Sequence, residues 1–141
     1  MILPDVNVLL HAFRTDAPEH ERHVEWVESL MWGEGVYGMS PQVLCSVVRI
    51  ATHRQIYPEP ASLESVIEFA NAVANRPNCQ IIQPGPRHWD IFMRLCRGTN
   101  ATGNLVSDVW FAALAIESGC EWITHDRDFA KFTGLRWRPP F

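Results

Sequence analysis

Several features that would assign this sequence of 141 residues to a class outright are missing. No apolar run approaches the roughly 20 residues that a membrane-spanning helix needs. The N-terminus lacks the basic flank and the long apolar stretch of a signal peptide. Neither glycine-rich phosphate loop, GxxxxGK(S/T) or GxGxxG, occurs. These absences predict a cytoplasmic protein with no membrane partner, and they leave nucleotide binding through such loops unsupported.

Metal-binding cysteine motifs are also absent. The four cysteines are scattered, without CxxC or CxH spacing: Cys45, Cys79, Cys96 and Cys120. Free core thiols in a reducing compartment explain this distribution better than disulfides or a zinc site do.

Positive charge is scarce, and lysine almost missing. The chain has one lysine, Lys131, beside eleven arginines, and its net charge is −4. This balance argues against a surface that coats nucleic acid in general. It does not exclude a nuclease, because metal-binding carboxylates add negative charge that an ion offsets. Genome composition explains the arginine bias at least as well as phosphate binding does.

Apolar residues make up 47% of the chain, which indicates a packed globular protein. The length fits a single domain, residues 1–141. Short apolar strands are predicted at 2–4, 36–39, 79–83 and 121–124, with a possible edge strand at 135–137. Helices are predicted at 6–13 and from about 18 to 32. Two more are predicted to begin at Ser40-Pro41 and at Ser62, and another to run from after Pro86 to about residue 97. The last two are predicted at 104–118 and 127–132. This alternation favours an α/β fold with a mostly parallel sheet of four to five strands covered on both faces.

Aspartates gather where such a sheet collects its strand ends. Four of the six aspartates lie there or in an apolar helix: Asp5, Asp108, Asp126 and Asp128. Gathered carboxylates repel one another unless protons or a cation neutralise them. A divalent ion with oxygen ligands is the simplest explanation, and metal-assisted phosphodiester cleavage is a common use of such an ion.

Each aspartate also has a structural interpretation. Capping the helix at 6–13 explains Asp5 about as well as metal binding does. For Asp108 the functional interpretation is favoured, because its helix is apolar nearly all round and an unpaired buried carboxylate needs a partner. Asp126, nearer the strand end, is the preferred ligand and Asp128 the second, and one of the two is expected to cap the short helix that follows.

Other side chains near these positions have weaker claims. Asn7 and Thr124 are candidates to hydrogen-bond the site or a water. His125 is a candidate general base near neutral pH, although solvated or core histidines are commoner. Arg49 is a candidate phosphate contact, and a surface salt bridge explains it equally well.

Substrate is expected to enter over the loop at 98–103, near the positive charges of Arg49, Arg87, Arg94 and Arg97. Trp89 and Trp110 are candidates to stack on bases, but both are predicted to be core residues.

Four segments resemble a known family. They are Asp5-Val6-Asn7, Ser40-Pro41-Gln42-Val43-Leu44, Asn104-Leu105-Val106-Ser107-Asp108, and Thr124-His125-Asp126-Arg127-Asp128-Phe129. Together, and in this order over nearly the whole chain, they look like a PIN-domain ribonuclease of the VapC toxin type. The resemblance implies a three-layer α/β/α sandwich and RNA cleavage dependent on Mg²⁺ or Mn²⁺. It also implies a homodimer inhibited by a small cognate antitoxin protein.

Carried over by position, the resemblance implies that Asp5, Asp108 and Asp126 are the catalytic metal-site acids, with Asp128 as an auxiliary ligand. The family usually places a glutamate where this chain has Ser46, whose hydroxyl carries no charge. A catalytically weak PIN-like module that binds RNA or a protein therefore stays open as the alternative. A phosphotransferase of another α/β family is disfavoured, because its pattern needs Asp-x-Asp where this chain has Asp5-Val6-Asn7.

Overall fold

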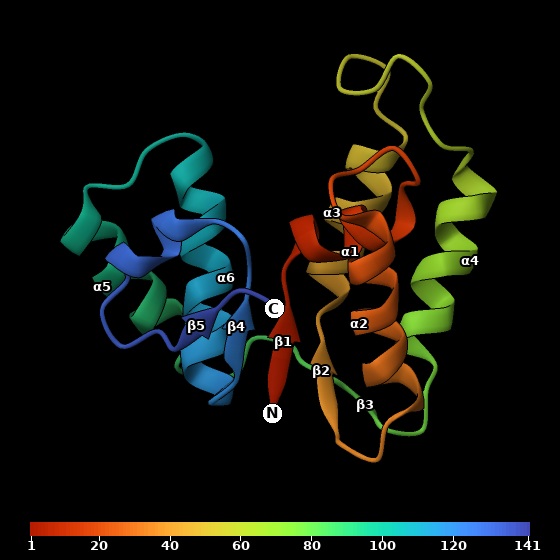
Figure 1. Cartoon of the computed structure of the whole chain (residues 1–141). Coiled ribbons are helices and arrows are strands. Elements are labelled where there is room, and N and C mark those ends of the chain that lie inside the picture. Colours follow the sequence, from red (N-terminus) through yellow and green to blue (C-terminus); the bar gives the residue numbers. More distant parts are fainter.

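The computed structural model describes residues 1–141 and contains short parallel strands with helices on both sides (Figure 1). The strands are β1 (Ile2–Pro4), β2 (Tyr37–Met39), β3 (Cys79–Ile81), β4 (Glu121–Ile123) and β5 (Trp137–Arg138). The helices are α1 (Val6–Phe13), α2 (His20–Trp32), α3 (Pro41–Ala51), α4 (Leu63–Ala74), α5 (His88–Thr99), α6 (Asn104–Ser118) and the 3₁₀ helix η1 (Arg127–Lys131).

Every strand pairing is parallel. β1 pairs with β4, β4 with β5, and β2 with β3, while β1 and β2 lie side by side (Figure 1). β1, β4 and β5 form one hydrogen-bonded sheet and β2 and β3 a second, and the contact between β1 and β2 gives the spatial order β3, β2, β1, β4, β5. The predicted α/β fold is confirmed. Helices α1 to α4 gather beside β2 and β3, and α5 and α6 beside β4 and β5.

The chain reverses its winding direction at β1. It moves outward from β1 to β2 and β3, then returns through α5 and α6 to β4 on the other side of β1. In open parallel sheets, ligands bind outside the carboxyl ends of the strands at such a reversal. Asp5 directly follows β1, and Asp126 lies just beyond β4. The topology therefore brings these two aspartates to the same crevice.

The helix starts follow local chemistry. Ser40 accepts a hydrogen bond from the backbone nitrogen of Gln42, and Ser62 accepts one from that of Ser65, so both predicted caps are confirmed. The predicted start of α2 at residue 18 is wrong. Glu19 has a left-handed backbone, with φ of 51°, so the helix begins only at His20.

Four predicted strands change their limits, and one predicted core residue is exposed. β2 begins at Tyr37 and β4 ends at Ile123, each one residue short of its prediction. β3 ends at Ile81 because its partner β2 ends at Met39, and the edge strand is Trp137–Arg138. Trp89 is 61% exposed. It follows the buried His88 on α5, and successive residues point about 100° apart around a helix, so Trp89 turns to solvent.

One continuous core joins the sheet to the helices. Leu3, Met39 and Trp122 contribute the strand side chains, and α6 is buried along Phe111–Ala115. All four cysteines are free, as predicted, but only Cys120 is buried in the core, and Cys45 is exposed. None of the helices has the length and apolarity to cross a bilayer.

Two glycines in or beside helices should respond oppositely to alanine. Gly119 ends α6 with φ of +70°, whereas Gly98 lies within α5 with open space around its Cα. Because a Cβ strains the left-handed backbone, Gly119→Ala should lower the free energy of unfolding by about 1 kcal/mol. Gly98→Ala should raise it by up to about 1 kcal/mol, because alanine loses less entropy in a helix. Urea denaturation of both variants tests this, and equal effects of the same sign would contradict it.

Candidate active site

Asp5 is held at the end of β1 by three hydrogen bonds. Its side chain is buried, with 6% of the residue exposed. Oδ1 accepts from the backbone nitrogen of Val6 at 2.6 Å, which caps α1 as the structural interpretation predicts. Oδ2 accepts from Asn7 Nδ2 at 2.8 Å and from Thr124 Oγ1 at 2.6 Å. A carboxylate offers about four lone-pair sites, so about one remains for a further ligand.

Thr124 links the two strand ends. Its hydroxyl donates to Asp5 and accepts from Asn7 Nδ2 at 2.9 Å and from the backbone nitrogen of Asp126 at 3.0 Å. Thr124 has no exposed surface. Asn7 Oδ1 in turn accepts from the backbone nitrogen of His125 at 3.4 Å. Thr124 and Asn7 therefore fix the position of Asp5 relative to the segment that carries Asp126.

Asp108 reaches the same region from the first half of α6. The residue is half-buried, and its carboxylate makes no hydrogen bond or ion pair within the protein. The following residues from Phe111 to Ala115 are buried as expected for a helix that is apolar nearly all round. An unpaired, half-buried carboxylate in that position has its acceptor sites free for a ligand.

The two aspartates after β4 have different surroundings. Asp126 Oδ1 accepts from the backbone nitrogen of Asp128 at 2.8 Å and caps η1, so the predicted capping role falls to Asp126. The Asp128 side chain is 75% exposed and lies 3.8 Å from Lys131 Nζ. Asp126 lines the cleft described below, and Asp128 does not.

A cleft of about 660 Å³ opens over these residues. Asp5, Asp108 and Asp126 all line it. The other polar residues of its wall are Asn7, Gln42, Ser46, Arg49, Asn104 and Ser107. Side chains from the end of β1, from α1, α3 and α6, and from the segment after β4 thus share one concave surface.

The electrostatics of the cleft disfavour negative charge. Burial raises the pKa of the Asp5 carboxyl from 3.8 to about 7, opposed by the hydrogen bonds from Thr124 and Val6 and reinforced by the charges of Asp108 and Asp126. Burial also raises the pKa of Asp108, again with help from Asp126. A cation in the cleft would relieve both penalties.

The carboxylates share the cleft without forming a compact cage. Only one group of three or more histidine, cysteine or acidic side chains has its ligand atoms within 4.8 Å of one another, and that group is His11, His23 and His125. Asp5, Asp108 and Asp126 do not form such a group. Mg²⁺ keeps several of its waters when a protein binds it, so it does not need a compact cage of protein ligands.

Of the side chains predicted to support the site or contact substrate, Asn7, Ser46 and Arg49 line the cleft, and so does Trp110. Ser46 and Arg49 both face it from α3, and Arg49 takes part in none of the ion pairs of the protein. The salt bridge that offered an alternative explanation for Arg49 is therefore absent. Arg87, Arg94 and Arg97 are exposed on or beside α5, outside the cleft lining.

Asn104 and Ser107 had no predicted role, although both lie in one of the four segments that resemble the family. They line the cleft with Asp108. The spacing carried the signal, because residues three and four positions before or after one another share a helix face. His11 likewise had no predicted role, and His23 was predicted to belong to an apolar stripe of its helix. These two meet His125 only through the fold, and no spacing in the sequence predicts that.

The pKa of Asp5 leads to a pH-dependent stability. Because the folded-state pKa of about 7 exceeds the ordinary value of 3.8, the folded protein keeps the proton where the unfolded chain has lost it. Without metal, this contribution favours folding at acidic pH and is lost as the pH rises from about 4 to 7. The unfolding free energy of the wild type relative to Asp5→Asn should therefore fall over that range, by at most roughly 4 kcal/mol.

Urea unfolding in EDTA across this pH range measures the effect. Asp90→Asn, which changes an exposed acid on α5, is the matched control and should keep a constant offset. A constant offset for Asp5→Asn as well would contradict the burial argument. Added Mg²⁺ should reduce the slope, because the ion stabilises the ionised carboxylate.

Comparison with known proteins agrees with this geometry. A family model described as PIN domain matches residues 2–135. The chain is 36% identical over 140 residues to the VapC ribonuclease Mb2897 of Mycobacterium bovis, covering 99% of this chain and 95% of that protein. It is also 36% identical over 141 residues to ribonuclease VapC25 of Mycobacterium tuberculosis, covering 99% of each.

Solved structures share the fold at lower identity. VapBC-1 from nontypeable Haemophilus influenzae superimposes with a TM-score of 0.70 at 19% identity, covering 99% of this chain and 98% of that one. VapBC2 from Rickettsia felis, bound to a promoter DNA fragment, gives a TM-score of 0.68 at 16% identity, covering 99% of this chain and 98% of that one. The family match and the relatives confirm the resemblance: the chain belongs to the PIN-domain family and, within it, to the VapC ribonucleases.

Proposed function

We propose that this protein is a metal-dependent endoribonuclease that cleaves RNA phosphodiesters in the aspartate cleft, as the toxin of a toxin–antitoxin pair. The observation that carries the proposal is the meeting of Asp5, Asp108 and Asp126 around one cleft, in a chain that is 36% identical to VapC ribonucleases over its whole length. Fold likeness alone would support a site at this position without its chemistry.

Mg²⁺ is the proposed ion, with Mn²⁺ as a substitute. Asp5, Asp108 and Asp126 would hold it, with Asp128 contributing negative charge from outside the cleft lining. The donor set fits: Asp108 has no protein partner, Asp5 keeps about one free lone-pair site, and all of these ligands are oxygens, which Mg²⁺ prefers. Bound there, such an ion would supply Lewis acidity for the activation of a water for in-line attack on the phosphodiester and for stabilisation of the leaving oxygen.

The remaining residues position the acids and the substrate. Thr124 and Asn7 hold the Asp5 carboxylate in one orientation through hydrogen bonds of 2.6 and 2.8 Å. Arg49, with no carboxylate partner, offers its guanidinium to an RNA phosphate, which such a planar donor can bind with two hydrogen bonds. Ser46 offers a hydroxyl to a water in the cleft.

The proposed partners are an RNA substrate, a cognate antitoxin protein and a second copy of the chain in a homodimer. Membership of the VapC group supports all three, and structures of VapBC proteins with the same fold support the antitoxin. An antitoxin that covers the cleft would block RNA from the aspartates.

The alternative is a catalytically weak PIN-like module that binds RNA or a protein. Ser46 favours it, because the cleft has no fourth acid on α3 where the family usually places glutamate. A weak module would bind RNA equally well in EDTA and without cleavage, whereas the proposed enzyme needs the ion.

Cleavage of total RNA by purified protein free of antitoxin separates the two. With Mg²⁺ or Mn²⁺ we expect discrete fragments, no cleavage in EDTA, and a loss of roughly 100-fold or more in rate for Asp108→Asn, since that carboxylate acts through the ion. Asp90→Asn on the exposed face of α5 is the control and should cleave normally. Intact RNA under every condition would instead support the binding module.

A glutamate at position 46 should strengthen ion binding. Ser46→Glu adds a carboxylate to the cleft wall, and ligand charge sets the affinity for hard divalent ions. We expect the Kd for Mg²⁺, measured by calorimetry, to fall roughly tenfold. Gln42→Glu adds the same charge one turn earlier on α3 and should have a smaller effect. Equal affinity in Ser46→Glu and the wild type would show that Ser46 does not face the ion.

A further inference from the structure

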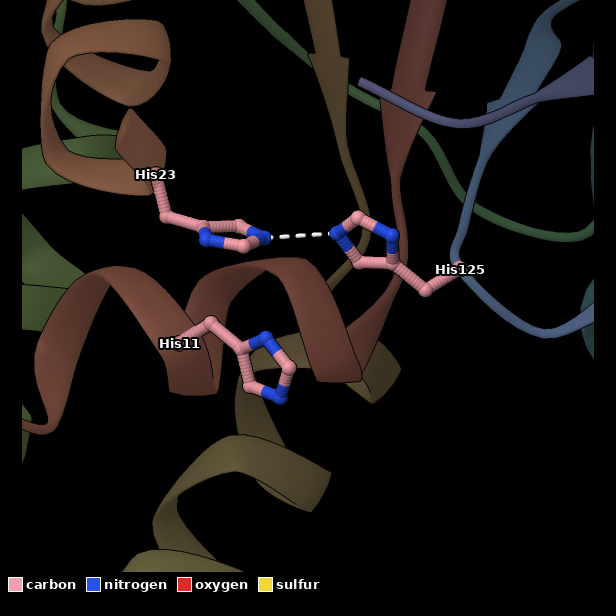
Figure 2. Close-up of side chains that lie close together, drawn as sticks. All are labelled: His11, His23 and His125. Carbon is pink, nitrogen blue, oxygen red and sulfur yellow. Dashed lines mark hydrogen bonds between the residues drawn. The ribbon is translucent and has the colours of Figure 1, made fainter. Parts of the chain in front are cut away.

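A second group of potential metal ligands lies outside the cleft. His11, His23 and His125 have ligand atoms within 4.8 Å of one another (Figure 2). They come from α1, from α2 and from the segment between β4 and η1, and none of them lines the aspartate cleft.

His23 is held in the tautomer that a metal requires. It is 1% exposed, and its Nδ1 lies 2.8 Å from the carbonyl oxygen of Glu19. A carbonyl only accepts hydrogen bonds, so Nδ1 carries the proton and Nε2 keeps a lone pair. Metal-binding histidines are usually fixed in this way, by a hydrogen bond from the other ring nitrogen. Nε2 points at His125 Nε2, 2.6 Å away.

His11 adds a nitrogen that the protein leaves unsatisfied. Its Nδ1 is buried and has no hydrogen-bond partner. Its ring centroid lies 4.8 Å from that of His23 and 5.7 Å from that of His125. Figure 2 shows the ring beneath the other two, with one nitrogen turned towards them. Buried polar atoms without a partner are costly and uncommon, so this nitrogen indicates a missing ligand.

We propose that His11, His23 and His125 form a binding site for Zn²⁺, separate from the aspartate cleft. Three imidazoles suit zinc and other late transition metals, whereas Mg²⁺ and Mn²⁺ prefer oxygen ligands. Zn–N bonds of about 2.0–2.1 Å in a tetrahedron place ligand nitrogens about 3.4 Å apart. The two Nε2 atoms at 2.6 Å must therefore separate by less than about 1 Å as the ion enters. A fourth ligand such as water would complete the tetrahedron.

In the His23–His125 pair, ion binding requires the proton of His125 to move from Nε2 to Nδ1. Without metal, His125 Nε2 donates its proton to the lone pair of His23 Nε2, because His23 has its own proton on Nδ1. With metal, His125 carries its proton on Nδ1 instead and offers Nε2 to the ion. Both imidazoles stay neutral, so this exchange releases no net proton. Burial and the neighbouring His23 lower the pKa of His11 and His125, which supports neutral rings at pH 7.

An ion at this site would clamp the elements that shape the cleft. α1 carries both Asn7 and His11, one turn apart, and the backbone nitrogen of His125 donates to Asn7 Oδ1. His125 is followed directly by Asp126. Zinc would therefore stabilise the fold around the aspartates without occupying the cleft, and the proposal holds whether or not the cleft cleaves RNA.

Thermal unfolding of the chelator-treated full chain tests the site. Zn²⁺ is titrated in a large excess of Mg²⁺, which occupies the oxygen ligands of the cleft. At about a hundred times its Kd, Zn²⁺ should raise the Tm by roughly 5–10 °C. His11→Gln, which removes the half-buried ligand, should lose most of this shift. His53→Gln, a histidine after α3 and outside the cluster, and Asp108→Asn in the cleft should both retain it.

Co²⁺ absorption provides a second measurement that does not depend on stability. Co²⁺ in a tetrahedral nitrogen site absorbs visible light far more strongly than Co²⁺ in an octahedral oxygen site. We expect strong bands in the wild type and in His53→Gln, and their loss in His11→Gln and His125→Gln. The proposal is overturned if Zn²⁺ leaves the wild-type Tm unchanged, if the His11→Gln variant keeps the shift or the bands, or if Asp108→Asn abolishes them.

Discussion

The hydrogen bond from the Thr124 hydroxyl to the Asp5 carboxylate joins the carboxyl ends of β1 and β4, and the arrangement of the site depends on it. Asp5 is buried at the point where the sheet reverses its winding direction, so its charge must be compensated there. Three hydrogen bonds compensate it in part, yet its pKa stays raised, to about 7. The two neighbouring acids increase that penalty. A divalent ion held by these aspartates would complete the compensation, and metal-assisted phosphodiester cleavage uses such an ion.

Two ligand sets of opposite preference lie on either side of Asn7. The aspartates present oxygens to a cleft, and the histidines present nitrogens to one another between α1, α2 and the segment after β4. Asn7 contacts both sides, since its Nδ2 donates to Asp5 and its Oδ1 accepts from the backbone of His125. The two proposed ions would therefore act on one connected framework, one in the reaction and the other in holding the strand ends.

Much of the site followed from the sequence because the signals were local. A short apolar run ending in aspartate, a Ser-Pro helix start and an apolar helix containing Asp108 each fix an element, and a parallel sheet collects strand ends at one edge. Non-local packing decided the rest. The exposure of Trp89 depended on which face of α5 meets Trp110, and the left-handed Glu19 delayed the start of α2. The histidine group joins residues 102 positions apart, and no periodicity predicts such a pairing.

Paramagnetic broadening of backbone amide resonances by Mn²⁺ tests the central claim, that the aspartates of the strand ends hold a divalent ion. The structure predicts that substoichiometric Mn²⁺ broadens the amides of Val6, Asp108 and Asp126 first, because these three segments surround the cleft. Asp108→Asn should weaken that broadening, and excess Mg²⁺ should reverse it. Broadening centred on another part of the surface, or unchanged in Asp108→Asn, would contradict the account.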